Sequence, residues 1–315
     1  MAGVMPRSGW ARMARPFNIL VTGGAGQIGL ELAKTSWPAE VRLQMPKRDQ
    51  LDLADARSVG AMFEGQRFDA VINSAAYTAV DRAEEEVAAA FAANALGPAL
   101  LADHTRKAGI PLIQLSTDYV FDGRTDRSYR ETDPVAPLGV YGASKLAGEL
   151  AVRTGNSRSL VLRTAWVLSP HGGNFLKTML RVGVTQPTVR VVDDQFGCPT
   201  SAADIATTLV TLTLRMIDDP QAPTGVYHFV NQGETSWCGL AEEIFRVSGA
   251  LGGPSNRVTA CPSTSCSPTV TTTETHGGCA RPSAARCTAS AAACTSWRGA
   301  GPWRRSSSVT SCRAA

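Results

Sequence analysis

The stretch FNILVTGGAGQIGLELAK, residues 17–34, decides the fold of this chain. Its first six residues, Phe17–Thr22, are mostly aliphatic or β-branched, as in a buried strand. Glycines follow, and Ile28 and Leu32 then recur at a helical spacing. Glycines allow a tight turn and a close approach of the backbone to a phosphate, which the next helix N-terminus attracts. The segment therefore predicts a dinucleotide-binding turn made by Gly23, Gly26, Gln27, Ile28 and Gly29.

Aliphatic runs and amphipathic stretches alternate along the chain after this unit. We expect further strands at 41–45, 68–73, 110–116 and 160–168. Between the expected strands at 68–73 and 110–116, residues 84–94 and 97–107 predict one long helical stretch, kinked at Pro98. Such alternation predicts an α/β fold, a Rossmann-like doubly wound parallel sheet with a smaller interwoven substrate-binding region. Ligands of such a sheet bind at the carboxyl ends of its strands.

Two cations follow the second expected strand. In a NAD-selective protein this place usually presents an acid to the adenosine ribose, whereas here it holds Lys47 and Arg48. A pair of cations could take up the 2′-phosphate of NADPH. The alternative is a solvated loop charge with no ligand. Both NADPH and NADH therefore stay open as cofactors.

A Tyr and a Lys stand four residues apart in Tyr141-Gly142-Ala143-Ser144-Lys145. On a helix they share one face, where the ammonium would stabilise tyrosinate and lower the tyrosine pKa from about 10. Such a tyrosine can give its proton to a carbonyl oxygen as a hydride reaches the carbon. Thr117, at the end of the fourth expected strand, can hydrogen-bond the same oxygen or simply cap the strand end. We therefore predict Thr117, Tyr141 and Lys145 as catalytic residues.

Five segments in order carry a resemblance to a known family. They are Asn73–Asp81, Ser116–Gly123, Tyr141–Lys145, Arg163–Val167 and Asp194–Thr200. With the G-x-x-G-x-x-G spacing of the glycines, the chain resembles the dTDP-4-dehydrorhamnose reductases of the extended short-chain dehydrogenase/reductase superfamily. The resemblance runs from about Asn18 to about Gly252. It implies reduction of a dTDP-4-keto-6-deoxy sugar by NADPH or NADH, in nucleotide-sugar biosynthesis.

The resemblance also implies roles for individual residues. Tyr141 would donate the proton, with Lys145 as its partner and as a contact of the nicotinamide ribose, and with Thr117 completing the trio. The sugar contacts would be Thr78, Thr117, Asp118, Trp166 and Asn174. The residues around the dinucleotide would be Gly26, Gln27, Ile28, Asp52, Leu53, Ala75, Ala76, Tyr77, Asn94, Ser116, Tyr141 and Lys145. Trp166 could equally be a core residue, and Asp52 a helix cap.

The same resemblance also bears on metal binding and on oligomeric state. Some members bind Mg²⁺ at a dimer contact, and Glu31 matches one ligand position. Thr185 stands where another acid is expected, which argues against metal dependence. A homodimer is consistent with the family. His228, among apolar strand neighbours, is expected to be a packed core residue rather than a catalyst.

Two other functions share these features. A nucleotide-sugar epimerase or dehydratase would have the same fold, glycines and Tyr–Lys pair, although many dehydratases carry Asp-Glu where this chain has Asp118-Tyr119. A catalytically silent regulatory subunit would keep the cofactor site and bind a partner protein. The presence of Thr117, Tyr141 and Lys145 argues against silence.

The composition changes sharply near Ala260. Residues 261–315 hold six of the eight cysteines, and Ser, Thr and Ala make up 29 of the 55 residues. This segment has six Arg and one Glu, a net charge of +5, so residues 1–260 carry −1 of the chain's +4. The basic charge thus gives no support for nucleic-acid binding by the body. We interpret 261–315 as an out-of-frame or disordered tail, with zinc binding and a disulfide-rich module as disfavoured alternatives.

The remaining expectations concern organisation and compartment. Residues 1–16 should be a non-structural extension, 17–170 the NAD(P)-binding domain with part of 200–230 returning to it, and 171–260 mainly the sugar-nucleotide region. No apolar run is long enough to span a bilayer, and no secretory signal is expected. Only two cysteines in the body fit a reducing cytoplasm.

Overall fold

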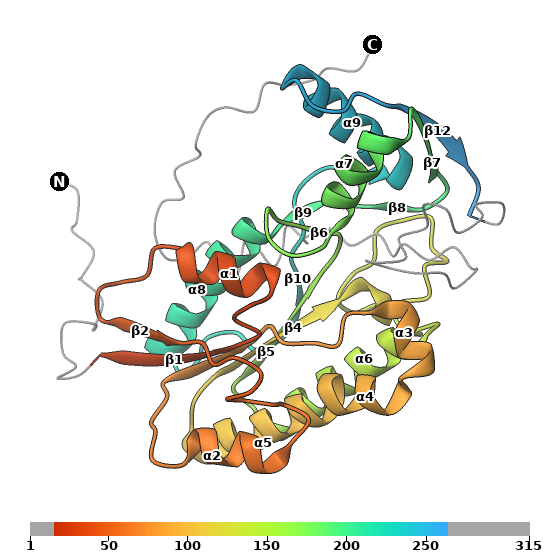
Figure 1. Cartoon of the computed structure of the whole chain (residues 1–315). Coiled ribbons are helices and arrows are strands. Elements are labelled where there is room, and N and C mark those ends of the chain that lie inside the picture. Colours follow the sequence, from red (N-terminus) through yellow and green to blue (C-terminus); the bar gives the residue numbers. More distant parts are fainter. Residues whose placement is uncertain (1–15, 264–315) are drawn as a thin grey trace, which may run out of the picture.

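Six parallel strands form the central sheet of the structure, a computed structural model that describes residues 16–263 (Figure 1). Their order is β10-β5-β4-β3-β1-β2. The sheet reverses direction of winding between β1 and β3, so their carboxyl ends form the crevice where such sheets bind ligands. The strands are β1 (Phe17–Thr22), β2 (Val41–Gln44), β3 (Ala70–Asn73), β4 (Leu112–Thr117), β5 (Ser159–Thr164) and β10 (Gly225–His228). The predicted doubly wound parallel sheet is confirmed.

Helices cover both faces of this sheet because its strands are apolar on both sides. On one face, Ile19 and Val21 pack with Leu32 of α1 (Gln27–Lys34) and Leu209 of α8 (Ala202–Asp218). On the other face, alternate strand residues such as Leu20 pack against α2 (Ala56–Phe63), α5 (Gly97–Ala108) and α6 (Val140–Gly155). Two buried layers therefore hold the strand ends rigid beneath the site.

A second region follows the carboxyl end of β5 and has its own buried cluster. Its elements are β6 (Val167–Leu168), α7 (Phe175–Thr185), β7 (Thr188–Val192), β8 (Phe196–Gly197), β9 (Thr200–Ser201), β11 (Thr235–Ser236), α9 (Trp237–Ala250) and β12 (Arg257–Cys261). β12 runs parallel to β7, and α9 packs on both α7 and this strand pair. The chain returns from this region to the main sheet through α8 and β10, which pairs with β5.

The expected long helix over 84–94 and 97–107 is interrupted at Glu86, and it is distorted before Pro98, where a kink was predicted. The structure has α3 (Val80–Glu85), α4 (Val87–Phe91), a π-helical segment η2 (Ala92–Leu96) and then α5. Pro98 lies in the first turn of α5 and has no N–H for the carbonyl of Asn94, four residues earlier. The helix therefore widens into a π turn before the proline, a feature often found at functional sites.

The expected fifth strand over 160–168 is also divided. β5 ends at Thr164, and β6 pairs with β9 instead of continuing in the main sheet. Between them Trp166 has φ of +46°, a left-handed conformation that is rare for a bulky residue. This bend turns the chain out of the sheet and into the second region.

The expectation for His228 is confirmed, whereas those for the two ends of the chain lie outside the described residues. His228 is buried, 3% exposed, with its ring edge-on to Phe121, as expected for a core residue. The segments 1–15 and 264–315, which contain the predicted extension and nearly all of the predicted tail, lie outside the described residues. Within residues 16–263, no helix is both long and apolar enough to cross a membrane.

Candidate active site

The glycine-rich turn joins β1 to α1 at the crevice. Gly23 has φ of +72°, and a Cβ there would lie 2.6 Å from the Ala75 nitrogen. A Cβ on Gly29 would lie 2.4 Å from the Gly23 carbonyl oxygen. Both positions therefore require glycine, one for its backbone conformation and the other for close packing of helix on turn.

The start of α1 fits a phosphate. Its N-cap, Gly26, is extended and offers no side chain to accept a hydrogen bond from the first-turn N–H groups. Ala25 and Gly26 are exposed, whereas Gly29 is buried beneath them. These N–H groups and the positive end of the helix dipole can bind an anion. The predicted residues Gly23, Gly26, Gln27, Ile28 and Gly29 are thus together in a cradle of the right chemistry for a pyrophosphate.

Lys47 and Arg48 follow β2, the strand beside β1, and both are exposed. Met45, just before them, packs on Gly24, so this loop is next to the glycine-rich turn. Arg48 pairs with Asp52 at 3.6 Å, with the arginine side chain 86% exposed. The cations are thus free to turn toward a phosphate beside the turn, and a surface ion pair of this kind contributes little to hold them back.

Asp52 and Leu53 are placed differently from each other. The Asp52 carboxylate accepts a hydrogen bond from the Ala54 N–H at 3.0 Å. Leu53 is buried against Gly97 of α5. The alternative of Asp52 as a helix cap is wrong, because Asp55 is the N-cap of α2 and accepts from the Arg57 N–H.

The segment after β3 is held by Asn94 of the π turn. The Asn94 side chain accepts from the Tyr77 N–H at 2.8 Å and donates to the Tyr77 carbonyl at 3.0 Å. It also donates to Ser144 Oγ on α6 at 3.0 Å. Asn94 is 1% exposed, so it acts on the site by joining the segment 75–77 to α6. Ala75 and Ala76 are partly exposed beside the turn, and Thr78 is exposed.

Thr117, at the carboxyl end of β4, meets Tyr141 near the start of α6. The two side chains are close enough for the Thr117 hydroxyl to lower the pKa of Tyr141. Thr117 Oγ1 also donates to Asp118 Oδ1 at 3.0 Å and accepts from the Tyr119 N–H at 3.2 Å. A Cβ on Gly142 would lie 2.2 Å from the Tyr119 carbonyl oxygen, so the glycine after Tyr141 lets α6 approach this closely. The end of β4 and the start of α6 thus bring the Thr117 and Tyr141 hydroxyl groups together.

The predicted effect of Lys145 on the tyrosine pKa is wrong. The pKa of Tyr141 is raised to about 12, mainly by burial and also by the charge of Asp118, while the Thr117 hydroxyl acts to lower it. The Lys145 Nζ donates to the Leu115 carbonyl at 2.7 Å, and its charge is not sufficient to bring the tyrosine pKa below the usual value. Desolvation of the anion therefore outweighs the ammonium one turn away, which the spacing of Tyr and Lys could not reveal.

Two other buried groups have pKa values near neutrality. Burial lowers the pKa of Lys145 to about 8, and the charge of Glu149 opposes that shift. Burial raises the pKa of Asp118 to about 7, against hydrogen bonds from Thr117 and from backbone N–H groups that lower it. Perturbed groups gathered at one strand end are typical of a catalytic site.

Trp166, predicted as a sugar contact or a core residue, follows the end of β5 and belongs to the buried cluster of the second region. Its ring stacks on Trp237 with centroids 3.5 Å apart and planes 9° apart. Gly197 of β8 packs against the same ring. Trp166 is 7% exposed, so most of its side chain is packed as in a core residue.

Asn174 connects the second region to the glycine-rich turn. It caps α7 and donates from Nδ2 to Gln27 Oε1 at 2.9 Å and to the Ser169 carbonyl at 2.7 Å. Nearby, Lys34 Nζ donates to His171 Nε2 at 2.6 Å, and that nitrogen lies 3.3 Å from a carboxylate oxygen of Glu31. Across residues 16–263 no three His, Cys, Asp or Glu side chains gather as a metal site, and a Mg²⁺ role for Glu31 stays a prediction.

Sequence reasoning assigned no role to a buried ion pair beneath the catalytic residues. Glu149 of α6 accepts from Arg163 at 2.6 and 2.9 Å and from the Ser116 hydroxyl. Ser116, predicted as a cofactor contact, is thus turned toward Glu149. The signal was present in the sequence as an acid four residues after Lys145 on one helix face.

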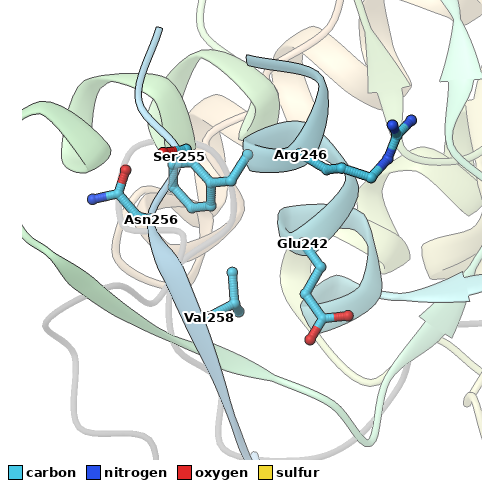
Figure 2. Close-up of a pocket in the computed structure, with 6 residues that line it drawn as sticks. Glu242, Arg246, Ser255, Asn256 and Val258 are labelled. Atoms are coloured by element: carbon cyan, nitrogen blue, oxygen red, sulfur yellow. The ribbon is translucent and has the colours of Figure 1, made fainter. Parts of the chain in front are cut away.

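A separate cavity of about 230 Å³ lies between α9 and β12 (Figure 2). Its lining residues are Glu242, Phe245, Arg246, Ser255, Asn256 and Val258. None of the predicted catalytic, cofactor or substrate residues lines it.

Comparisons with known proteins agree with this geometry. The RmlD substrate binding domain family matches residues 17–308. A dTDP-4-dehydrorhamnose reductase of Sinorhizobium fredii is 43% identical over 230 residues, 73% of this chain and 77% of that protein.

Solved structures of similar proteins have the same fold. A dTDP-4-dehydrorhamnose reductase of Clostridium acetobutylicum is 36% identical, with a TM-score of 0.73 over 78% of this chain and 84% of that one. Another from Bacillus anthracis, in complex with NADP, is 31% identical, with a TM-score of 0.75 over 87% and 90% of the two chains. The chain therefore belongs to the RmlD substrate binding domain family, alongside relatives named dTDP-4-dehydrorhamnose reductase.

Proposed function

We propose that this chain reduces the C4 keto group of dTDP-4-dehydro-β-L-rhamnose to give dTDP-L-rhamnose, with NADPH or NADH as reductant. The observation that carries the proposal is the meeting of Tyr141 and Thr117 at the carboxyl end of β4, with Lys145 one turn further along α6. A carbonyl oxygen placed against these two hydroxyl groups has a proton donor and a second hydrogen-bond donor. Membership of a family whose relatives carry this name supports the choice of substrate.

The cofactor would be held by the turn between β1 and α1. The first-turn N–H groups of α1 and the open glycines fit a pyrophosphate, and Ala75 and Ala76 border it after β3. Lys47 and Arg48 fit a 2′-phosphate, which favours NADPH, and the Bacillus anthracis relative was solved with NADP. When bound, NADPH supplies the hydride that reaches the substrate carbon.

Tyr141 acts as a neutral acid in this scheme. Because burial raises its pKa to about 12, the phenol holds its proton at neutral pH until negative charge develops on the substrate oxygen. The Tyr141 O–H then gives that proton to the oxygen, and the Thr117 hydroxyl donates a hydrogen bond to the same substrate oxygen. The buried Lys145 ammonium, fixed on the Leu115 carbonyl, adds positive charge beside the tyrosinate that forms.

The sugar would occupy the space between the strand ends and the second region. Asp118 follows Thr117, and Trp166 lies at the bend that leads from β5 into that region. Thr78 is exposed after β3 and can reach a ligand there. Asn174 uses its side chain on Gln27, so it would act by tying the second region to the cofactor turn. A homodimer and a cytoplasmic location are part of this proposal.

The test is a product assay on the purified chain with dTDP-4-dehydro-β-L-rhamnose and NADPH. We expect NADPH absorbance to fall with the appearance of an equal amount of dTDP-L-rhamnose, identified by nuclear magnetic resonance (NMR) spectroscopy. Conversion of the sugar without net NADPH consumption would indicate an epimerase or dehydratase. Tight NADPH binding with no conversion of any 4-keto sugar nucleotide would indicate a silent subunit.

A further inference from the structure

A buried ion pair and a serine hydroxyl lock α6 to the ends of two neighbouring strands. Arg163 of β5 donates through Nε and Nη2 to the two carboxylate oxygens of Glu149, and Ser116 of β4 donates to the same carboxylate. Glu149 is 1% exposed and Arg163 is 3% exposed. Ser116 and Arg163 are paired directly across β4 and β5. The cluster therefore fixes one helix against two adjacent strands at a single point.

Each predicted catalytic residue lies close to this cluster in the sequence or along α6. Glu149 lies one helical turn after Lys145, and Tyr141 lies one turn before it. Thr117 is the neighbour of Ser116, and Lys145 Nζ donates to the carbonyl of Leu115, on the other side of Ser116. A shift of α6 relative to β4 would consequently misplace Thr117 and Tyr141 relative to each other.

The negative charge of Glu149 also acts on the Lys145 ammonium. Tyr141 and Glu149 lie one turn before and one turn after Lys145 on α6. Among the neighbouring ionisable groups, Asp118 acts on Tyr141, Arg163 pairs with Glu149, and Glu84 of α3 binds the Val140 N–H at the start of α6. Among these, Glu149 is the group whose charge acts on the pKa of Lys145, raising it against the effect of burial. A buried ammonium needs such a counter-charge to stay protonated near neutral pH.

Arg163 is the counter-charge of Glu149 in turn. Its guanidinium lies over the Phe121 ring at 5.0 Å, and its Nη1 has no hydrogen-bond partner within residues 16–263. A carboxylate this deeply buried is strongly unfavourable without such a bidentate partner. Stability alone does not explain the pair, because apolar residues of similar volume are often equally stabilising.

We propose that Glu149 is a positioning residue for the reaction: held by Arg163 and Ser116, it fixes α6 against β4 and supplies the negative charge that keeps the buried Lys145 ammonium protonated. The proposal rests on the proposed function, since it concerns the same Lys145 and Tyr141. Glu149 touches neither substrate nor cofactor in this scheme and acts through its neighbours.

The proposal predicts a specific change in the pH profile of Glu149→Gln. In the parent chain, kcat should fall as pH rises through about 8, where the Lys145 ammonium loses its proton. Without the carboxylate charge, the Lys145 pKa is lower, so this limb should move to lower pH and kcat at pH 8 should drop by about tenfold relative to the parent. Glu149→Asp retains the charge and should restore the parent limb in part.

A double variant separates this role from a purely structural one. In Glu149→Gln/Arg163→Met the unpaired buried arginine is removed, so thermal stability should recover relative to Glu149→Gln alone. The shifted alkaline limb should nevertheless persist, because Lys145 still lacks its counter-charge. Recovery of both stability and the parent limb in the double variant would overturn the proposal. Glu243→Gln, which removes an exposed pair with Arg246, is the matched control and should leave the limb in place.

A readout without turnover distinguishes failure of this inference from failure of the proposed function. The side-chain pKa of Lys145 can be followed by carbon-13 NMR of labelled lysine, with its signal assigned by loss in Lys145→Met. The titration should move to lower pH in Glu149→Gln even if the parent chain reduces no sugar nucleotide. An unchanged Lys145 titration in Glu149→Gln would contradict the proposal whatever the activity.

Discussion

Tyr141 is the residue on which the chemistry depends, and its surroundings define its role. It is 9% exposed, close to the Thr117 hydroxyl, and edge-on to Tyr119 with ring centroids 5.5 Å apart. A phenol in this environment keeps its proton at working pH and gives it up only to a strongly basic oxygen. It is therefore suited to protonating an alkoxide and unsuited to acting as a resting-state base.

Replacing Tyr141 by Phe should reduce kcat by between about a hundredfold and ten-thousandfold, because the general acid is lost. The dissociation constant for NADPH should change by less than about twofold, since the pyrophosphate cradle is on another element. Steady-state kinetics and fluorescence titration measure the two quantities. Tyr227→Phe, which removes a hydroxyl bonded to the Thr224 carbonyl, is the control. Unchanged kcat in Tyr141→Phe would remove this residue from the reaction.

Residue spacing predicted which side chains meet but not their protonation. The strand end at Thr117 and the helical Tyr141–Lys145 spacing were sufficient to bring these residues together. The pKa of Tyr141 depends on how much solvent the fold removes and on the charge of Asp118, neither of which a local pattern records. Glu149 and Arg163 were missed for a similar reason, since their pairing joins a helix to a strand.

At the scale of elements, the junction of β1 and α1 depends on a close contact at Gly29. A Cβ there would lie 2.4 Å from the Gly23 carbonyl oxygen and 2.6 Å from the Gly24 Cα, both of them backbone atoms. The side chain could be accommodated only by moving the turn. The helix and the cradle for the pyrophosphate are therefore one structural unit.

Gly29→Ala should weaken NADPH binding by at least about tenfold, although alanine is favoured over glycine within a helix by about 1 kcal/mol. Gly60→Ala in α2 is the matched control, because a Cβ there would meet no atom within 4 Å. That control should bind NADPH normally and gain up to about 1 kcal/mol in the free energy of unfolding. Titration with NADPH and chemical denaturation measure both effects. Normal NADPH affinity in Gly29→Ala would show that the contact is not needed.

The strands and helices of the main sheet could be predicted from periodicity, whereas their interruptions could not. The π turn at Ala92–Leu96 follows from Pro98 together with the buried side chain of Asn94, which serves Tyr77 and Ser144. The break after Thr164 places Trp166 at φ of +46° so that its ring reaches Trp237. The two-residue strands β6, β8, β9 and β11 likewise exist only through distant partners. In each case a tertiary contact overrides the local pattern.

At the scale of the molecule, two layers of core surround the sheet and a third cluster fills the second region. Several contacts connect that region to the catalytic side, and two of them involve predicted sugar contacts. One is the Trp166–Trp237 stack, to which Phe175 of α7 adds a ring 4.6 Å from Trp237. The other is the Asn174–Gln27 hydrogen bond. The second region is thus placed against both the strand ends and the cofactor turn.

Trp237→Ala should lower the free energy of unfolding by about 3 kcal/mol, as expected for truncating a buried aromatic residue. Because Trp166 loses its stacking partner, KM for the sugar nucleotide should rise more than KM for NADPH. Trp237→Phe keeps part of the stack and should show a smaller rise. Denaturation curves and initial rates with each substrate varied provide the comparison. An equal change in both KM values would mean that the stack has no particular role at the sugar.

The central claim is that hydride passes to C4 of the sugar while Tyr141 protonates the oxygen. The most direct measurement uses NADPH carrying deuterium at C4 of the nicotinamide, each diastereomer in turn, with dTDP-4-dehydro-β-L-rhamnose as substrate. We predict that one of the two labelled cofactors gives dTDP-L-rhamnose with deuterium at C4 of the sugar, detected by NMR and mass spectrometry. A reduced sugar that carries no deuterium at C4 from either cofactor would contradict the account.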